Sequence, residues 1–311
     1  MKPAISVAIL NYQRRDVLRR ALGAVGTQKL DQPWEVIAVD NASTDGSADM
    51  VRAEFPRVRV VELPENMGAA GRNAGVEAAR GPIVVTLDND VLLTSPDDLA
   101  HVLDVFAHSP RAAVVSFMIL GPGGTLSRRD WCHPRDPDAW AEREFLTDYV
   151  LEGASACRRH AFLAAGGYWK PFFIGHEGWD LGLRLINAGW EVRYTPTVRV
   201  HHLVESSARP SSRIYYTFTR NAIWVALRNH GPAAAVPSIA RDLSLMAFSA
   251  ARAGHLGAYA RGVRDGIVGA RRALATRQTL TGPARRRLRR IRALEPGVVA
   301  RARRHLRERL I

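Results

Sequence analysis

The stretch Pro82–Leu93, which reads Pro-Ile-Val-Val-Thr-Leu-Asp-Asn-Asp-Val-Leu-Leu, joins an apolar strand to a cluster of carboxylates. Its β-branched and apolar run Ile83–Leu87 follows the turn signal Gly81-Pro82 and predicts a buried strand. The strand delivers Asp88-Asn89-Asp90 at its carboxyl end. In open α/β sheets ligands bind at that end of the strands, so this stretch marks the expected site.

Two ionised carboxylates separated by one residue are costly to bury without a counter-charge. A divalent cation bound through oxygen atoms of Asp88 and Asp90 would supply that charge, and the same cation would hold the phosphates of a nucleotide. The alternative is a turn rich in aspartate and asparagine, whose side chains accept hydrogen bonds from nearby backbone N–H groups. The stretch by itself leaves both interpretations open.

Outward from this strand, the first 110 residues alternate strand and helix signals. Strands are expected at Ile5–Leu10, Trp34–Val39, Arg57–Leu63 and Ile83–Leu87, with helical segments at Asp16–Val25, from Ser47, at Ala69–Ala79 and at Pro96–Phe106. This alternation predicts βαβ units and an α/β fold, a doubly wound, mainly parallel sheet with helices on both faces. Residues 111–205 are expected to complete the sheet.

In such a sheet, the polar turns after the first, second and fourth strands fall on one edge. They form a single crevice that contains Asn11, Tyr12, Asp40, Asn41, Arg72, Asn73, Asp88 and Asp90. The acidic end of the second strand can hydrogen-bond a base or ribose, and Arg72 at a helix start can meet a phosphate. Neither a Gly-x-Gly-x-x-Gly turn nor a Walker loop follows the first strand, which argues against dinucleotide oxidoreductases and nucleoside triphosphatases.

Composition is that of a globular protein, with 47% hydrophobic and 24% charged residues among 311. No apolar run is long enough to span a bilayer, and Ala4–Leu10 is too short for a signal peptide, so a cytoplasmic protein is expected. The two cysteines, Cys132 and Cys157, make neither a disulfide framework nor a zinc site.

The formal net charge of +14 is concentrated in arginine clusters beyond residue 270. No nucleic-acid module is visible, so nucleic acid is not an expected partner. The tail Ala284–Ile311 interleaves arginine with apolar residues at helical spacing, which would let it lie on an anionic membrane at the inner face of the cell. The same periodicity suits helices packed on the catalytic domain with a solvated arginine face, and both possibilities stay open.

Four motifs in order carry a resemblance to a known family. They are Ser6–Tyr12, Val39–Ser47, Asn66-Met67-Gly68 with Arg72–Gly75, and Leu87–Asp90. Together they resemble family 2 glycosyltransferases, inverting enzymes of the GT-A fold that use nucleotide-diphosphate sugars. The resemblance covers about residues 4–225 and implies a nucleotide-sugar-binding half at 1–110, an acceptor-binding and catalytic half at 111–205, and a basic amphipathic helical region at 206–311.

On the donor side, the resemblance implies that Asp40 contacts the base, with Asn11 and Tyr12 as the wall of the base site. Asn41 and Arg72 would lie near the nucleotide. The run Asp88-Asn89-Asp90 matches the family's Asp-x-Asp. Asp90 would be the direct ligand of Mn²⁺ or Mg²⁺, while Asp88, also a candidate ligand, would lie nearer the ribose or sugar with Asn89 between them.

On the catalytic side, the family reads Glu-Asp-x-Asp-Leu at a helix start, where one leading carboxylate is the general base. This chain has Glu177-Gly178-Trp179-Asp180-Leu181, so the second acid is missing. Glu177 is the preferred base and Asp180 the second candidate. The alternative for Asp180 is a carboxylate in the first turn of a helix, favoured by the helix dipole.

A histidine follows Pro196 in relatives with this layout and completes the metal site. The doublet His201-His202 occupies that position, with His202 preferred on spacing and His201 as the fallback. Imidazole is a suitable ligand beside carboxylate and phosphate oxygens. Between the two halves of the site, Ser127–Glu144 is expected to form a flexible acceptor loop.

The expected activity is an inverting, metal-dependent hexosyl or deoxyhexosyl transfer from a UDP- or dTDP-sugar. The acceptor would be a hydroxyl of a lipid-linked or cell-surface glycan, or of a soluble small molecule. Asp40-Asn41 and Arg220-Asn221 lean toward rhamnosyl- or galactofuranosyl-type relatives. Gly178 keeps open a non-catalytic sugar-nucleotide-binding protein, whereas a nucleotidyltransferase is disfavoured because its Gly-rich phosphate loop is missing.

Overall fold

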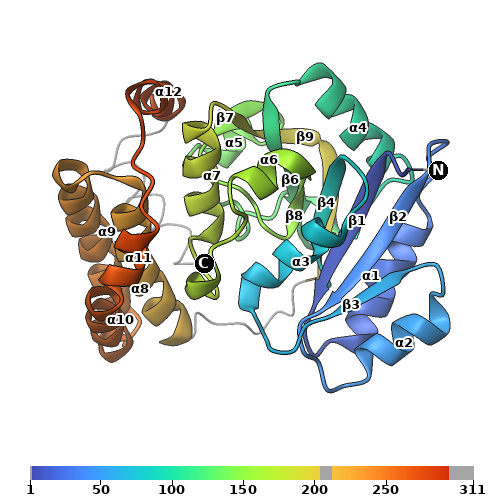
Figure 1. The fold of residues 1–311 in the computed structure, drawn as a ribbon, viewed down its shortest axis with the longest axis horizontal. Helices are drawn as coiled ribbons and strands as arrows, with labels where there is room; N and C mark the ends of the chain where they lie inside the picture. Colours follow the sequence, from blue (N-terminus) through green and yellow to red (C-terminus); the bar gives the residue numbers. More distant parts are fainter. Residues whose placement is uncertain (1, 204–211, 294–311) are drawn as a thin grey trace.

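The computed structural model describes residues 2–203 and 212–293. Within them, nine strands form one sheet, in the order β3-β2-β1-β4-β8-β6-β9-β5, with β7 paired to β9 (Figure 1). The strands are β1 Ile5–Asn11, β2 Trp34–Asp40, β3 Arg59–Glu62, β4 Ile83–Asp88, β5 Val91–Leu93, β6 Ala112–Leu120, β7 Phe145–Thr147, β8 Ala154–Arg158 and β9 Glu191–His202. One continuous sheet thus joins both halves of the sequence.

The first half of the sheet is parallel, as the alternation of strands and helices predicts. The second half is mixed: β8 runs antiparallel to β4 and β6, and β5 and β7 run antiparallel to β9. The α/β sheet with helices is therefore confirmed, with parallel pairing in its second half only between β6 and β9 among the described strands. Strand β5 is too short to be recognised from sequence periodicity.

Helices cover both faces of the sheet. The catalytic region contains α1 Arg15–Gly26, α2 Ser47–Glu54, α3 Gly71–Ala78, α4 Asp98–His108, α5 Pro137–Trp140, α6 Arg159–Ala164 and α7 Glu177–Asn187. Apolar residues of α1, α2 and α4 join one core cluster, and those of α3, α6 and α7 join the cluster on the other face. The central strands are consequently buried on both sides, which explains their continuous apolar sequence.

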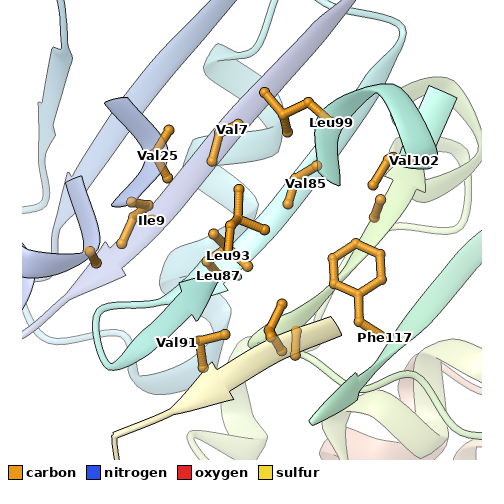
Figure 2. Close-up of a cluster of buried hydrophobic side chains, with 14 of the residues drawn as sticks. Val7, Ile9, Val25, Val85, Leu87, Val91, Leu93, Leu99, Val102 and Phe117 are labelled. Carbon is orange, nitrogen blue, oxygen red and sulfur yellow. The ribbon is translucent and has the colours of Figure 1, made fainter. Parts of the chain in front are cut away.

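Alternation along β1 and β4 sorts their side chains between the two clusters. Val7, Ile9, Val85 and Leu87 point toward α1 and α4, where Leu99 packs among them (Figure 2). Their sequence neighbours belong to the opposite cluster, as the two-residue period of a strand requires. Packing on both faces fixes the ends of β1 and β4, and therefore also the positions of the polar residues that follow them.

The segment predicted as a flexible acceptor loop, 127–144, contains α5 and packs by its aromatic side chains. Trp131 contacts Phe145 and Tyr194 edge-on, and the Arg135 guanidinium lies 4.1 Å from the ring of Trp140. These contacts attach the segment to β7 and β9. It forms a packed wall beside the sheet edge.

The C-terminal region consists of α8 Ser212–Asn229, α9 Pro232–Arg252, α10 Leu256–Val268, α11 Ala270–Ala275 and α12 Gly282–Arg292. It lies on the side of the molecule opposite the first βαβ units (Figure 1). On α12, Leu288 and Ile291 are buried in a cluster with residues of α7, and most of its arginines are exposed. For α12, this arrangement is the second of the two possibilities given above, a helix packed on the catalytic domain with a solvated arginine face. Residues 294–311, the remainder of the expected membrane-binding tail, lie outside the described residues.

Among the described helices, none combines the length and apolarity required to cross a bilayer.

Replacing Leu99 by alanine should lower the free energy of unfolding by about 2–5 kcal/mol, because the side chain is fully buried between α4 and the sheet. Leu245→Ala on α9 is the matched control: Leu245 is largely exposed, and its loss should change stability by less than about 0.5 kcal/mol. Urea denaturation followed by circular dichroism measures both. Equal stability losses would contradict the assignment of Leu99 to the core.

Candidate active site at the carboxyl edge of the sheet

Polar side chains from three neighbouring strands meet at the carboxyl edge. β1 ends at Asn11, β2 at Asp40 and β4 at Asp88, and the register sets Asn11 beside Asp40 and Leu10 beside Asp88. Next to Asn11, the Tyr12 side chain is 46% exposed and open to a ligand. The structure therefore brings these residues together, as the parallel arrangement predicts.

Buried amides hold the loops of this crevice. Asn89 Nδ2 donates to Asn11 Oδ1 at 2.7 Å, and Asn11 Nδ2 donates to Asp40 Oδ1 at 3.4 Å. The Asn41 Oδ1 atom accepts a hydrogen bond of 2.8 Å from the backbone N–H of Met67, which fixes the loop after β3. Asn11, Asn41 and Asn89 thus tie together the loops at the carboxyl edge, while their direct contact with a donor stays a prediction.

Arg72 lies beneath the first carboxylate. It is buried near the start of α3, its guanidinium forms an ion pair with Asp88, and its Nη1 donates to the carbonyl oxygen of Ala69 at 3.2 Å. From the sequence, Arg72 was expected to meet a phosphate, and a divalent cation was expected beside Asp88. In the structure the counter-charge of Asp88 is the guanidinium of Arg72, and the role of Asp88 as a metal ligand stays a prediction.

Asp90 and His202 come together because β5 pairs with the end of β9. His202 Nε2 lies 3.6 Å from Asp90 Oδ1, and His202 Nδ1 lies 3.0 Å from Asp130 Oδ2. Arg14 Nη1 also lies 2.5 Å from Asp90 Oδ2. The hydrogen bond with Asp130 and the neighbouring Asp90 raise the pKa of His202 to about 10.

The chemistry of this set fits a divalent cation. Asp90 and the Nε2 atom of His202 offer one oxygen and one nitrogen ligand, and a carboxylate behind the ring, here Asp130, is the arrangement that orients metal-binding histidines. His201 precedes His202 in β9, so its side chain points to the opposite face of the sheet. In the part of the chain that the structure describes, no three His, Cys, Asp or Glu residues form a group that could hold a metal ion.

Glu177 occupies the first position of α7. The preceding His176 has a φ of 68° and Gly175 a φ of 93°, a left-handed turn that starts the helix and directs Glu177 inward. Its side chain is buried, and Oε2 has no hydrogen-bond partner among residues 2–203 and 212–293. Burial raises the pKa of this carboxyl, while backbone N–H groups and Arg72 oppose the increase. A buried carboxylate oxygen without a partner is suited to accept a proton.

Asp180 has a different environment. It is fully buried and lies 2.8 Å from Arg184 Nη2 and 3.0 Å from Arg228 Nε, and it accepts a hydrogen bond of 2.7 Å from Asn229 Nδ2. Although burial alone would raise its pKa, the two arginines hold the pKa of Asp180 below its usual value. Both of its oxygens are engaged, which favours the alternative of a structural carboxylate that attaches α8, while its role as the second candidate base stays a prediction.

Sequence reasoning missed two acidic residues of this edge. Asp130 comes from the segment expected to be a flexible loop, and Glu152 lies just before β8. Burial and the nearby Glu177 raise the pKa of Glu152 to about 8. Neither residue carries a signal in the local sequence, because each reaches the site through contacts that are distant in the chain.

The sequence profile described as "Glycosyl transferase family 2" matches residues 6–164, slightly more than half of the chain. The chain belongs to this family. Its match covers the donor-side strands and motifs and ends within α6. The predicted family and the enzyme class, a glycosyltransferase, are thereby confirmed.

Relatives and solved structures agree with this membership. The chain is 27% identical over 267 residues to the N-acetylglucosaminyl-diphospho-decaprenol L-rhamnosyltransferase of Mycobacterium tuberculosis, covering 74% of this chain and 87% of that protein. It is 27% identical over 235 residues to the O-antigen biosynthesis protein RfbC of Myxococcus xanthus, covering 68% of this chain but 18% of that protein.

Two solved glycosyltransferases share the fold. The mannosyltransferase PcManGT from Pyrobaculum calidifontis, in complex with GDP-Man and Mn²⁺, aligns with a TM-score of 0.57 and 23% identity, over 98% of this chain and 88% of that chain. TarS 1-349 of S. aureus, in complex with UDP-GlcNAc, aligns with a TM-score of 0.59 and 17% identity, over 88% and 83%. The GT-A fold and its C-terminal helices are confirmed.

Replacing Asp180 by asparagine should lower the free energy of unfolding by about 3–5 kcal/mol, because Arg184 and Arg228 would lose their shared buried counter-charge. The exposed Asp104→Asn on α4 serves as the control and should be nearly neutral. Thermal or denaturant unfolding measures the difference. A stable Asp180→Asn protein would show that the arginines do not depend on this carboxylate.

Proposed function

We propose that this family 2 glycosyltransferase is an inverting, metal-dependent enzyme that uses a nucleotide-diphosphate sugar. The observation that carries the proposal is the buried Oε2 of Glu177, which has no hydrogen-bond partner in the described part of the chain. It lies near enough to Arg72 and Asp88 for their charges to act on its pKa. A proton acceptor thus lies at the strand ends where the family binds its donor. The Asp90–His202 pair occupies the same edge.

In the proposed reaction, Glu177 accepts the proton of the acceptor hydroxyl as the hydroxyl oxygen attacks the anomeric carbon of the donor sugar. The bond from that carbon to the diphosphate oxygen breaks on the opposite side, and the nucleoside diphosphate leaves. Inversion follows from this single displacement. A positioned general base typically contributes about 10²–10⁴-fold to such a step.

Asp90 and His202 would hold Mn²⁺ or Mg²⁺, with Asp130 accepting the Nδ1–H hydrogen bond that leaves Nε2 free as a ligand. When bound, the metal would neutralise charge on the departing diphosphate. Arg72 stays with Asp88 and fixes the orientation of that carboxylate beside the donor.

For the substrates, we propose a UDP- or dTDP-linked hexose or deoxyhexose as donor and a lipid-linked glycan as acceptor. The support is the alignment along most of the mycobacterial L-rhamnosyltransferase, whose name specifies a diphospho-decaprenol acceptor. Exposed apolar side chains on α9 and α10, among them Phe248, Ile267 and Val268, lie in a region rich in arginine. They support peripheral attachment to the inner face of the cell membrane, where such an acceptor would be found.

A Glu177→Gln enzyme should bind its donor normally and lose about 10²–10⁴-fold in kcat, because the amide cannot take the acceptor proton. The wild-type enzyme is first assayed for transfer from UDP-, dTDP- and GDP-sugars to a polyprenyl-diphosphate-linked acceptor and to soluble hydroxyl acceptors. The exposed Glu77→Gln on α3 is the control. Near-normal turnover by Glu177→Gln would remove Glu177 from the role, and no transfer by the wild type would favour a binding protein.

Replacing His202 by alanine should abolish the additional thermal stabilisation that Mn²⁺ gives to the donor-bound protein, because one of the two proposed protein ligands is lost. The neighbouring His201→Ala, on the other face of β9, should retain it. Thermal-shift titrations of UDP and dTDP with and without Mn²⁺ make the measurement. Equal Mn²⁺ effects in both variants would contradict the proposed metal site.

A further inference from the structure

The first turns of α8 and the middle of α10 border an open groove among the C-terminal helices (Figure 1). Its volume is about 320 Å³, at the lower end of the range for small-ligand sites. It forms where the two helices pack closely, because a side chain at Gly262 of α10 would overlap the carbonyl oxygen of Tyr216 of α8. We call it the α8–α10 groove, and it is lined by Ser212, Arg213, Tyr216, Arg261 and Asp265.

The lining of the α8–α10 groove carries an excess of positive charge. Within residues 2–203 and 212–293, neither Arg213 nor Arg261 forms an ion pair. The carboxylate of the lining, Asp265, is already engaged: Arg264 Nε lies 2.8 Å from its Oδ1 atom, and the Tyr216 hydroxyl donates to Oδ2 at 2.9 Å. Two guanidinium groups therefore remain for an anion, and the planar guanidinium matches phosphate oxygens in pairs.

The groove lies next to the catalytic crevice. The Arg213 guanidinium lies 4.9 Å from the ring centre of Phe173, just before α7. Less than two turns further along α8, the ring centre of Phe218 lies 4.9 Å from that of His176, which directly precedes Glu177. A ligand with an anionic group in the groove can therefore extend toward the proposed base.

Exposed apolar side chains lie near the same turns of α8. Tyr215 of α8 packs in a buried cluster with Ala250 of α9 and Ala258 of α10, close to the connection between those two helices. Phe248 and Leu256 flank that connection, and each is more than half exposed. They offer an apolar surface to a hydrocarbon chain whose headgroup occupies the groove.

We propose that the α8–α10 groove binds the diphosphate of a lipid-linked acceptor, with Arg213 and Arg261 contacting its phosphate oxygens. The first units of the lipid chain lie over Phe248 and Leu256, and the acceptor sugar extends toward Glu177. The donor diphosphate stays at the carboxyl edge of the sheet, so the two diphosphates of the reaction occupy separate sites. This inference rests on the proposed function, because it takes a lipid-linked glycan as the acceptor.

The first test measures binding of farnesyl diphosphate, a soluble prenyl diphosphate, by calorimetry with UDP and Mn²⁺ present to occupy the donor site. Arg213→Gln and Arg261→Gln should each weaken binding about tenfold, because each removes a charge-assisted contact with phosphate. Farnesol, which lacks the diphosphate, should not respond to either change. No binding by the wild type, or equal binding by the wild type and both variants, would overturn the inference.

Two further variants separate the headgroup, the lipid chain and the overall charge. The exposed Arg271→Gln on α11 removes the same charge away from the groove and should bind farnesyl diphosphate like the wild type. Phe248→Ser should weaken farnesyl diphosphate and leave the binding of inorganic pyrophosphate unchanged. An equal loss in Arg271→Gln would reduce the effect to net charge and would also overturn the inference.

Kinetics distinguish this inference from the proposed function. With a polyprenyl-diphosphate-linked acceptor, both groove variants should raise the acceptor KM about tenfold and leave the donor KM unchanged. With the same sugar on an uncharged alkyl chain, neither KM should change. A raised donor KM would assign the arginines to the donor and overturn the inference. If lipid-linked acceptor is glycosylated with a normal acceptor KM in both variants, the groove is wrong and the function stands. If farnesyl diphosphate binding depends on the arginines while no acceptor is glycosylated, the diphosphate site stands and the proposed function fails.

Discussion

Several carboxylates are buried at the carboxyl edge of the sheet, and the surrounding elements are arranged to compensate their negative charge. An ionised carboxylate removed from water costs several kcal/mol unless a partner is close by. The compensating groups come from separate elements: Arg72 of α3 for Asp88, Arg14 and His202 for Asp90, and Arg184 with Arg228 for Asp180. The placement of α3, β9 and α8 around this edge follows from those pairings as much as from apolar packing.

The presence or absence of a neighbouring arginine also separates carboxylates with a structural role from those that could take part in proton transfer. Asp88 and Asp180 form ion pairs with neighbouring arginines, and the arginines beside Asp180 hold the pKa of that carboxyl below its usual value. Glu177 is buried and Glu152 half-buried, and among the described residues no arginine forms an ion pair with either. Desolvation shifts both pKa values upward. Perturbed carboxyl groups without a cation partner mark the part of the edge equipped for proton transfer.

Local sequence patterns predict the donor half well, because its geometry follows from strand periodicity and parallel pairing. The run Ile83–Leu87 and the turns after β1 and β2 place Asn11, Asp40 and Asp88 correctly. The second half of the sheet could not be predicted in the same detail. The three-residue β5 has no periodicity of its own, yet it determines that Asp90 meets His202. Asp130 and Glu152 depend on how a loop packs, and Asp180 on a helix that begins more than thirty residues later.

The attachment of α8 to the catalytic sheet also affects where the chain could be truncated. Arg228 of α8 forms an ion pair with Asp180, and Asn229 donates a hydrogen bond to the same carboxylate. Asn221 donates to the carbonyl oxygens of Phe172 and Gly175, just before the glutamate-bearing helix. A chain ending at residue 205 would contain the whole nine-stranded sheet and still lack these supports. An autonomous catalytic unit therefore has to include α8, and recombination with another relative's C-terminal helices must preserve that arginine and both asparagines.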